Sequence, residues 1–144
     1  MIPPLPESTA AILTNYPAAA QRLLLELRAL IFETAAGLPE VGALQESVRW
    51  GEVSFLTPSG AGSLLRIGWR PREPRMVALF LHCQTSLLAR FRARFGETLR
   101  YEGERAVLLA VDEALPHAAL AWCIAQALTY HRDRASRRAQ PARR

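Results

Sequence analysis

The sequence predicts a single α+β domain in which an antiparallel sheet of about five strands packs against N-terminal and C-terminal helices. The chain has 144 residues and half of them are hydrophobic, which suffices for one domain with a substantial core. Apolar residues recur at helical spacing near both ends and follow a strand-like pattern in between. Short loops join the first strand-like segments, and this favours antiparallel pairing because parallel strands need long crossovers.

Three helices are expected in the first third of the chain. The first begins at Glu7 or Ser8 and ends at Leu13, because Ser8 is a good N-cap before an apolar run. Pro17 suits the first turn of a longer second helix. Five apolar side chains share one face of that helix: Leu23, Leu24, Leu27, Leu30 and Ile31. The Gly-Leu-Pro segment at 37–39 ends it, and a third, short helix is expected from about residue 40 to 48.

The expected third helix ends at a Trp-Gly pair, after which the pattern becomes strand-like. Gly51 accepts backbone angles that other residues avoid, so it can turn the chain sharply. Trp50 is expected to be buried where helix and sheet meet, with its ring filling the space between them. Glu46 and Arg49, at positions i and i+3 of this helix, are expected to form a local surface ion pair.

The rest of the chain alternates between strands and helices. The expected strands lie at residues 53–57, 64–69, 76–82, 99–101 and 105–111. The third is apolar on both faces, as a central strand covered on two sides should be. A helix from residue 84 or 85 to Phe95 separates the third strand from the fourth, and a helix from Pro116 to Leu128 completes the domain.

The predicted domain covers residues 8–131, and an Arg-rich tail covers residues 132–144. All 18 basic residues are arginines. Six of them lie in the tail with one aspartate, which gives the tail a net charge of +5, whereas twelve arginines balance twelve acidic residues in the rest of the chain. The tail composition predicts disorder. The folded body lacks the basic balance of a nucleic-acid-binding domain, so nucleic acid is not an expected partner of the body.

The composition also indicates the cellular location. No apolar run approaches the roughly 20 residues of a membrane span, and the first residues lack the features of a secretory signal. Cys83 and Cys123 lie far apart in the sequence, which fits reduced thiols better than a disulfide framework. The exclusive use of arginine suggests a GC-rich bacterial genome. We therefore expect a bacterial cytoplasmic protein with no membrane association.

Residues that commonly carry catalysis or bind metals do not form recognisable motifs. His82 and Cys83 are neighbours on an expected strand, so their side chains face opposite sides. His117, Cys123 and His131 are separated by 6 and 8 residues, whereas a helical metal site favours i, i+4. We therefore assign no catalytic residue, no metal ligand and no cofactor. Catalysis stays open, because geometry and not sequence order defines such sites.

Three arginines within expected strands are the candidate ligand-binding residues: Arg66, Arg100 and Arg105. Each lies beside an apolar face, so it must form an ion pair, extend to solvent or bind an anion. A guanidinium binds carboxylate or phosphate through its planar fork. Three aromatic side chains could form the walls of such a pocket: Trp50, Trp69 and Tyr101. In the alternative interpretation, Glu46, Glu102 or Glu104 forms structural ion pairs with these arginines, which leaves no guanidinium for a ligand.

Several short motifs occur together along the chain: Arg49-Trp50-Gly51, Cys83-Gln84-Thr85, Phe95-Gly96 and Arg100-Tyr101-Glu102-Gly103. In combination they make residues 8–131 resemble the YdhG-like family (domain of unknown function 1801). The resemblance implies an α+β fold with an antiparallel sheet packed against helices. Some members are described as frataxin-like intracellular iron chaperones, a role that requires exposed carboxylates because iron prefers oxygen ligands. The long helix offers only Glu26 and Glu33.

We therefore expect an uncharacterised protein of the YdhG-like type that binds a small anionic ligand or serves as an interaction module, without established catalysis. Two alternatives remain open: a frataxin-like iron chaperone, and a nucleic-acid-associated protein that binds through its basic tail. An anion pocket predicts a concavity where the strand arginines converge with Trp50 or Trp69. An iron carrier predicts clustered exposed carboxylates, and a nucleic-acid binder predicts that binding is lost when the tail is removed.

Overall fold

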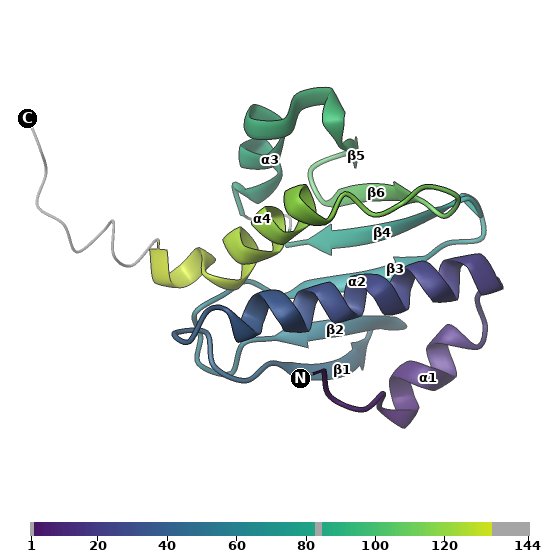
Figure 1. The fold of residues 1–144 in the computed structure, drawn as a ribbon, viewed down its shortest axis with the longest axis horizontal. Helices are drawn as coiled ribbons and strands as arrows, with labels where there is room; N and C mark the ends of the chain where they lie inside the picture. The colour runs from purple at the N-terminus through teal and green to yellow at the C-terminus, as the bar shows by residue number, and fades with distance from the viewer. Residues whose placement is uncertain (1, 83–84, 134–144) are drawn as a thin grey trace, which may run out of the picture.

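The computed structural model describes residues 2–82 and 85–133, and it confirms the predicted α+β class. Within these residues the sheet has six antiparallel strands in the order β1-β2-β3-β4-β6-β5, one more than expected (Figure 1). The elements in chain order are α1 (Glu7–Leu13), α2 (Ala18–Ala36), β1 (Gln45–Arg49), β2 (Glu52–Leu56), β3 (Leu65–Trp69), β4 (Met76–Leu81), α3 (Leu87–Phe95), η1 (Gly96–Thr98), β5 (Arg100–Glu102), β6 (Ala106–Ala110) and α4 (His117–Leu128).

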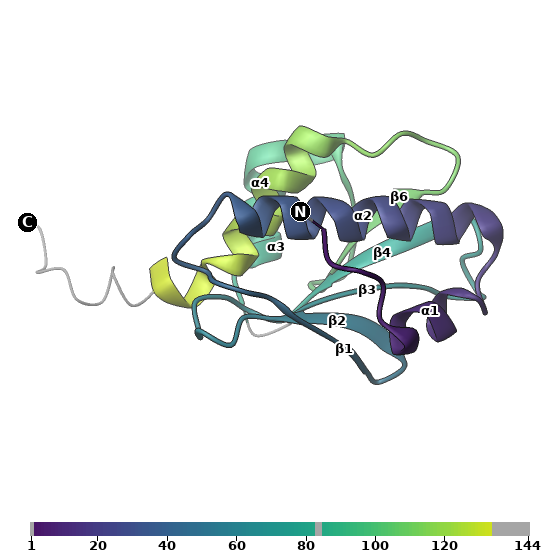
Figure 2. The same cartoon turned by 60° about the horizontal axis from the view of Figure 1, so that its bottom comes forward.

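One face of the sheet is covered by helices. Helices α2 and α4 pack against each other across this face, and α3 packs against α4 (Figures 1 and 2). The predicted apolar face of α2 is confirmed, since Leu24, Leu27 and Ile31 are at most 1% exposed. Phe55 of β2 and Phe91 of α3 are fully buried in the same core. Burial of these large side chains supplies the main driving force for docking the helices on the sheet.

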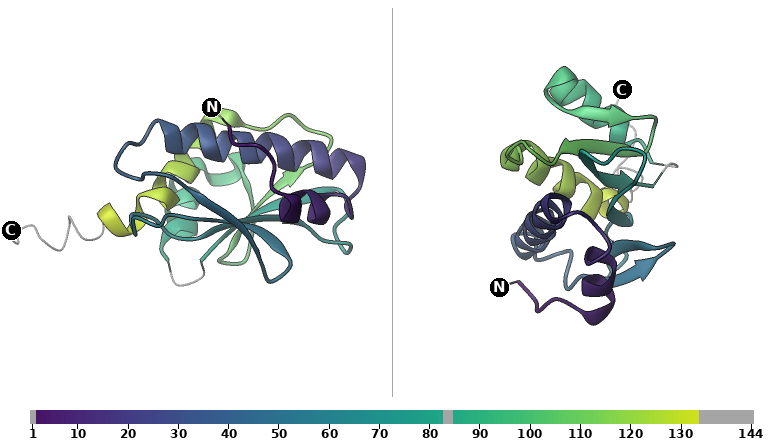
Figure 3. Two further views of the ribbon diagram at one scale, coloured as in Figure 1. Left: turned by 90° about the horizontal axis from the view of Figure 1, so that it is seen from below. Right: turned by 90° about the vertical axis from the view of Figure 1, so that its right-hand side faces the viewer.

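The opposite face of the sheet carries no helix among the described residues (Figure 3). Arg66 of β3 lies beside Ser54 of β2 on one side and beside Phe80 of β4 on the other. Phe80 in turn lies beside Ala106 of β6. Since paired residues point to the same side of a sheet, these side chains share this face, which is named the open face below. Phe80, Ala106 and Ala78 form a small buried apolar cluster separate from the main core.

The helix predicted from residue 40 to 48 is wrong, because residues 45–49 form the edge strand β1. β1 pairs with β2 along its whole length. Glu46 points to the helix-covered side, where it forms a buried ion pair with Arg28 of α2. A charged residue at this inward position conceals the apolar alternation that identifies a strand. The predicted surface pair between Glu46 and Arg49 is therefore wrong as well.

Trp50 and Gly51 form the two-residue turn between β1 and β2. Both have positive φ values, 52° and 75°, which is the backbone signature of a type I′ turn. Trp50 is 76% exposed, so its predicted burial between helix and sheet is wrong. The preceding segment is a strand, and this hairpin tip offers no helix–sheet junction for the ring to fill.

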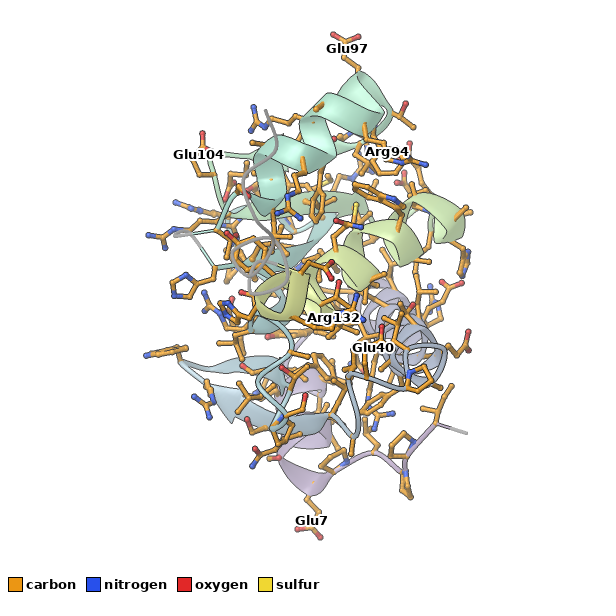
Figure 4. The ribbon with its side chains drawn as sticks, turned by 90° about the vertical axis from the view of Figure 1, so that its left-hand side faces the viewer. Glu7, Glu40, Arg94, Glu97, Glu104 and Arg132 are labelled. Atoms are coloured by element: carbon orange, nitrogen blue, oxygen red, sulfur yellow. The ribbon has the colours of Figure 1, made fainter. Side chains whose placement is uncertain are left out.

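The described part of the chain remains helical beyond the predicted domain boundary, as far as residue 133. Residues 130–133 are helical, and Arg132 forms an ion pair with Glu40, the two side chains lying close together in Figure 4. The backbone N–H groups of His131 and Arg132 both donate to the carbonyl of Ala61 at 2.9 Å. The loop between β2 and β3 thus holds the C-terminal end of the helical segment. Residues 134–144 of the predicted tail lie outside the described residues.

Candidate functional site

A cavity of about 700 Å³ lies over the open face of the sheet. Its walls come from β2, β3, β4, β5 and β6, from the β3–β4 loop and from the β5–β6 turn. The charged part of its lining consists of four arginines and three glutamates: Arg66, Arg70, Arg72, Arg105, Glu52, Glu102 and Glu104. This cavity is named the arginine groove. The strand register explains its position, because outward-facing residues of neighbouring strands converge there.

Arg66 is held in the wall of the groove by contacts on several sides. Its guanidinium forms an ion pair with Glu52 and lies 5.3 Å from the ring centre of Trp50 and 5.6 Å from that of Phe80. Gly68 makes room for this arrangement, because a Cβ atom there would lie only 3.3 Å from Oε2 of Glu52. Burial raises the pKa of Glu52, while the charges of the nearby arginines oppose the shift.

Arg70 bridges two carboxylates at the next position along the groove. Its Nη1 lies 2.8 Å from Glu102 Oε1 and its Nη2 lies 3.0 Å from Glu73 Oε1. The guanidinium also lies 5.5 Å from the ring centre of Phe80. The hydrogen bond from Arg70 lowers the pKa of Glu102, and the positive charge of Arg72 contributes to the same effect. Arg70 is therefore neutralised locally, like Arg66.

Arg72 and Arg105 differ from the other two arginines of the groove. Arg72 lies in the β3–β4 loop and Arg105 in the β5–β6 turn, yet both line the same cavity. Within residues 2–82 and 85–133, neither guanidinium forms a hydrogen bond or ion pair. Glu104, the third carboxylate of the groove, projects outward at the margin of the molecule (Figure 4). Two guanidinium groups from separate segments thus remain available to an anion.

A second cavity of about 320 Å³ adjoins the arginine groove, since Arg66 and Arg105 line both. Its other lining residues are Trp50, Leu64, Leu81 and His82. It is named the Trp50 pocket. The two cavities adjoin at Arg66 and Arg105. Together they are named the concavity, which has a charged part and a largely apolar part.

The structure brings together three of the six residues predicted to bind ligand: Trp50, Arg66 and Arg105. Arg100 also lies on the open face, but it lines a separate cavity of about 250 Å³ and forms an ion pair with Glu113 at 2.8 Å. Glu46, Glu102 and Glu104 were the predicted alternative partners of the strand arginines, but Arg66 forms its ion pair with Glu52.

Trp69 and Tyr101, the remaining predicted residues, lie on the helix-covered side and pack against the main core. Trp69 contacts the ring of Tyr16 at 5.6 Å and donates from Nε1 to the carbonyl of Pro74 at 2.9 Å. The hydroxyl of Tyr101 donates to the carbonyl of Phe91 at 3.1 Å, and burial raises the pKa of Tyr101. These contacts keep both rings away from the groove.

Sequence reasoning missed Glu52, Arg70 and Arg72 as parts of the concavity. Glu52 begins the strand that follows the Trp-Gly turn, and its position over the sheet depends on the empty space at Gly68. Arg70 and Arg72 flank a proline between two of the expected strands, outside any predicted element. A usable signal was present, because the loop places two further arginines close behind Arg66 on the same hairpin.

Among the described residues, no group of three His, Cys, Asp or Glu side chains is arranged to hold a metal ion. Cys123 is a buried free thiol, and burial raises its pKa to about 12, so it remains protonated at neutral pH. Of the neighbouring residues His82 and Cys83, Cys83 lies outside the described residues. None of the helices in the described ranges has the length and hydropathy needed to cross a membrane.

Comparison with known proteins identifies one relevant fold. No protein-family model and no curated protein sequence matches the chain. The crystal structure of a DUF1801 family protein, YdhG from Bacillus subtilis, superposes with a TM-score of 0.59 at 9% sequence identity, covering 96% of this chain and 98% of the other. This chain therefore has the fold of a DUF1801 family protein, as its resemblance to the YdhG-like family implied.

Proposed function

We propose that this protein binds a small anionic ligand in the arginine groove, with Arg72 and Arg105 as the principal contacts. The observation that carries the proposal is the placement of these two guanidinium groups. They come from the β3–β4 loop and the β5–β6 turn, line one cavity, and form no ion pair with any described residue. A carboxylate or phosphate could accept hydrogen bonds from both, each through the planar fork of the guanidinium.

The rest of the groove supports binding of an anion over binding of a cation. Glu52 and Glu102 are each engaged by an arginine, so their negative charge is compensated inside the groove. The groove also gathers side chains from several strands and loops of a twisted sheet, which gives a concave surface instead of a flat one. Its volume of about 700 Å³ admits a small molecule.

Isothermal titration calorimetry with inorganic phosphate and with citrate, at low ionic strength, tests the proposal. Replacement of a guanidinium that hydrogen-bonds a charged ligand costs about 1.5–3 kcal/mol, or roughly tenfold or more in affinity. Arg105→Gln and Arg72→Gln should each weaken binding by at least about tenfold. Binding should also weaken with added salt, because the site is open to solvent.

Arg100→Gln is the matched control, because Arg100 is also an arginine on the open face but lines another cavity. It should leave affinity unchanged. An absence of saturable binding of either anion would overturn the proposal. Equal loss of affinity in Arg100→Gln and Arg105→Gln would also overturn it, because the effect would then reflect general surface charge and not the groove.

A further inference from the structure

The conformation of the turn between β1 and β2 does not explain why a tryptophan occupies position 50. A type I′ turn favours Asn or Gly at its first central position, where φ is positive, and a bulky residue there is strained. Trp50 nevertheless occupies this position with φ 52° and leaves 76% of its surface exposed. Its ring lines the Trp50 pocket, and the guanidinium of Arg66 lies 5.3 Å from the ring centre.

The surroundings of Trp50 suit a flat apolar group. The Trp50 pocket has a volume of about 320 Å³, and Leu64 supplies further apolar surface beside the tryptophan ring. Arg66, which also lines the pocket, is fixed by its ion pair with Glu52 and by the ring of Phe80. A guanidinium held in this way can contact the face of an aromatic ring.

The position of Arg105 connects this pocket to the anion site. Arg105 lines both the Trp50 pocket and the arginine groove. A ligand with its ring beside Trp50 would therefore place a substituent near Arg105, which lines both cavities. The concavity thus offers a surface for stacking at one end and hydrogen-bond donors for an anion at the other.

We propose that the anionic ligand is aromatic: a planar ring occupies the Trp50 pocket and carries a phosphate or carboxylate that is bound by Arg105 and Arg72. This inference rests on the proposed function and specifies the class of ligand. Stacking of a ring on an aromatic side chain should raise affinity by about fivefold or more over the same anion without the ring. The pocket volume is compatible with a ring system of one or two fused rings.

Calorimetry on the full chain with 1-naphthyl phosphate and methyl phosphate tests the inference, because the two ligands share the phosphate group and differ in the ring. Naphthyl phosphate should bind at least about fivefold more tightly. Trp50→Ala should remove this advantage while leaving the affinity for methyl phosphate unchanged. Trp50→Tyr, which restores an aromatic face, should recover part of it. Leu25→Ala is a control, since Leu25 is an exposed apolar residue on α2.

The outcomes separate this inference from the proposed function. Equal affinities for the two phosphates, both weakened in Arg105→Gln, would overturn the aromatic ligand but leave the anion site intact. An undiminished naphthyl phosphate affinity in Trp50→Ala would overturn it as well. If uncharged 1-naphthol binds as tightly as naphthyl phosphate, and Arg105→Gln changes neither affinity, the anion site itself is rejected.

Discussion

Arg28 of α2 and Glu46 of β1 form a two-point ion pair in which Nη2 lies 2.9 Å from Oε1 and Nε lies 2.9 Å from Oε2. Their side chains are only 6% and 5% exposed. The hydroxyl of Thr9 donates to the same carboxylate at 3.0 Å, and Arg28 also donates to the carbonyls of Pro3 and Pro4. One buried network therefore connects the N-terminal segment, α1, α2 and the edge strand.

Glu46→Ala should lower the free energy of unfolding by about 3–5 kcal/mol, because it leaves the buried guanidinium of Arg28 without a compensating charge. Urea denaturation followed by circular dichroism measures this change. The double variant Arg28→Met/Glu46→Leu should lose less than Glu46→Ala alone, since it buries no charge. If the double variant is as unstable as the single one, packing and not charge compensation explains the role of this pair.

Gly62→Ala should destabilise the protein through a clash with the end of α4. A Cβ atom at Gly62 would lie 2.4 Å from the backbone carbonyl oxygen of Leu128, and backbone atoms cannot move aside cheaply. We expect a loss of about 1–3 kcal/mol in the free energy of unfolding. Gly37→Ala is the control, because a Cβ atom there meets only an ordinary contact at 3.5 Å. Equal stability of the two variants would contradict this prediction.

The sequence predicted most of the fold because most elements follow one dominant pattern. The apolar spacing from Leu23 to Ile31 identified α2, and the alternation around Ile67 identified β3. The sequence did not predict β1 as a strand, and the reason is physical. Its inward position 46 carries a glutamate whose partner, Arg28, lies in α2, 18 residues earlier in the sequence. A pattern of neighbouring residues cannot reveal a charge that is neutralised by a distant one.

Predicting the candidate site from the sequence was limited for the same reason, because the site depends on contacts between residues that are distant in the sequence. Arg66 and Arg105 could be selected because charged residues within predicted strands need partners, although Arg105 lies in the turn just before β6. Their separation from Trp69 depends on which face each strand turns toward the helices, and this follows only from the complete register. The availability of Arg105, in contrast to Arg66, depends on where Glu52 lies in space.

Cys123 should contribute to the loss of stability in alkaline solution. Burial raises its pKa to about 12 in the folded protein, above the value of about 8.5 for an unfolded chain. The folded state therefore holds the proton more tightly, and this contribution to stability is complete below about pH 8.5 and declines as pH rises toward 12. Between these values the free energy of unfolding should fall by up to about 1.4 kcal/mol per pH unit on account of this thiol.

Urea denaturation at a series of pH values from 7 to about 10.5 checks this, with Cys123→Ala compared against its parent in a Cys83→Ser background. The alanine variant can be less stable overall, yet its free energy of unfolding should decline less steeply above pH 8.5. Parallel pH profiles for the two proteins would contradict the assignment of a raised pKa to this thiol.

Removal of residues 134–144 should leave the midpoint of thermal unfolding unchanged. The segment is rich in arginine and alanine and has little apolar surface to offset the entropy of ordering. Removal from Arg132 onward should lower the midpoint, because it also removes the ion pair with Glu40 and a hydrogen bond to the carbonyl of Ala61. Scanning calorimetry distinguishes the two truncations. A drop of several degrees for the shorter deletion would show that the tail packs on the domain.

Trp50→Asn should make the protein at least as stable as the natural sequence. Asparagine tolerates the positive φ of 52° at this turn position better than tryptophan, and the exposed ring contributes little buried surface. The gain should approach about 1 kcal/mol, reduced by loss of the contact with Arg66.

The same variant should lose the affinity that 1-naphthyl phosphate gains over methyl phosphate. Urea denaturation and calorimetry on one preparation measure both effects. If the variant is more stable but binds 1-naphthyl phosphate more weakly, Trp50 is a ligand-binding residue that destabilises its own turn. If Trp50→Asn instead destabilises the protein by more than about 1 kcal/mol, the ring supports the hairpin, and its position no longer argues for a ligand.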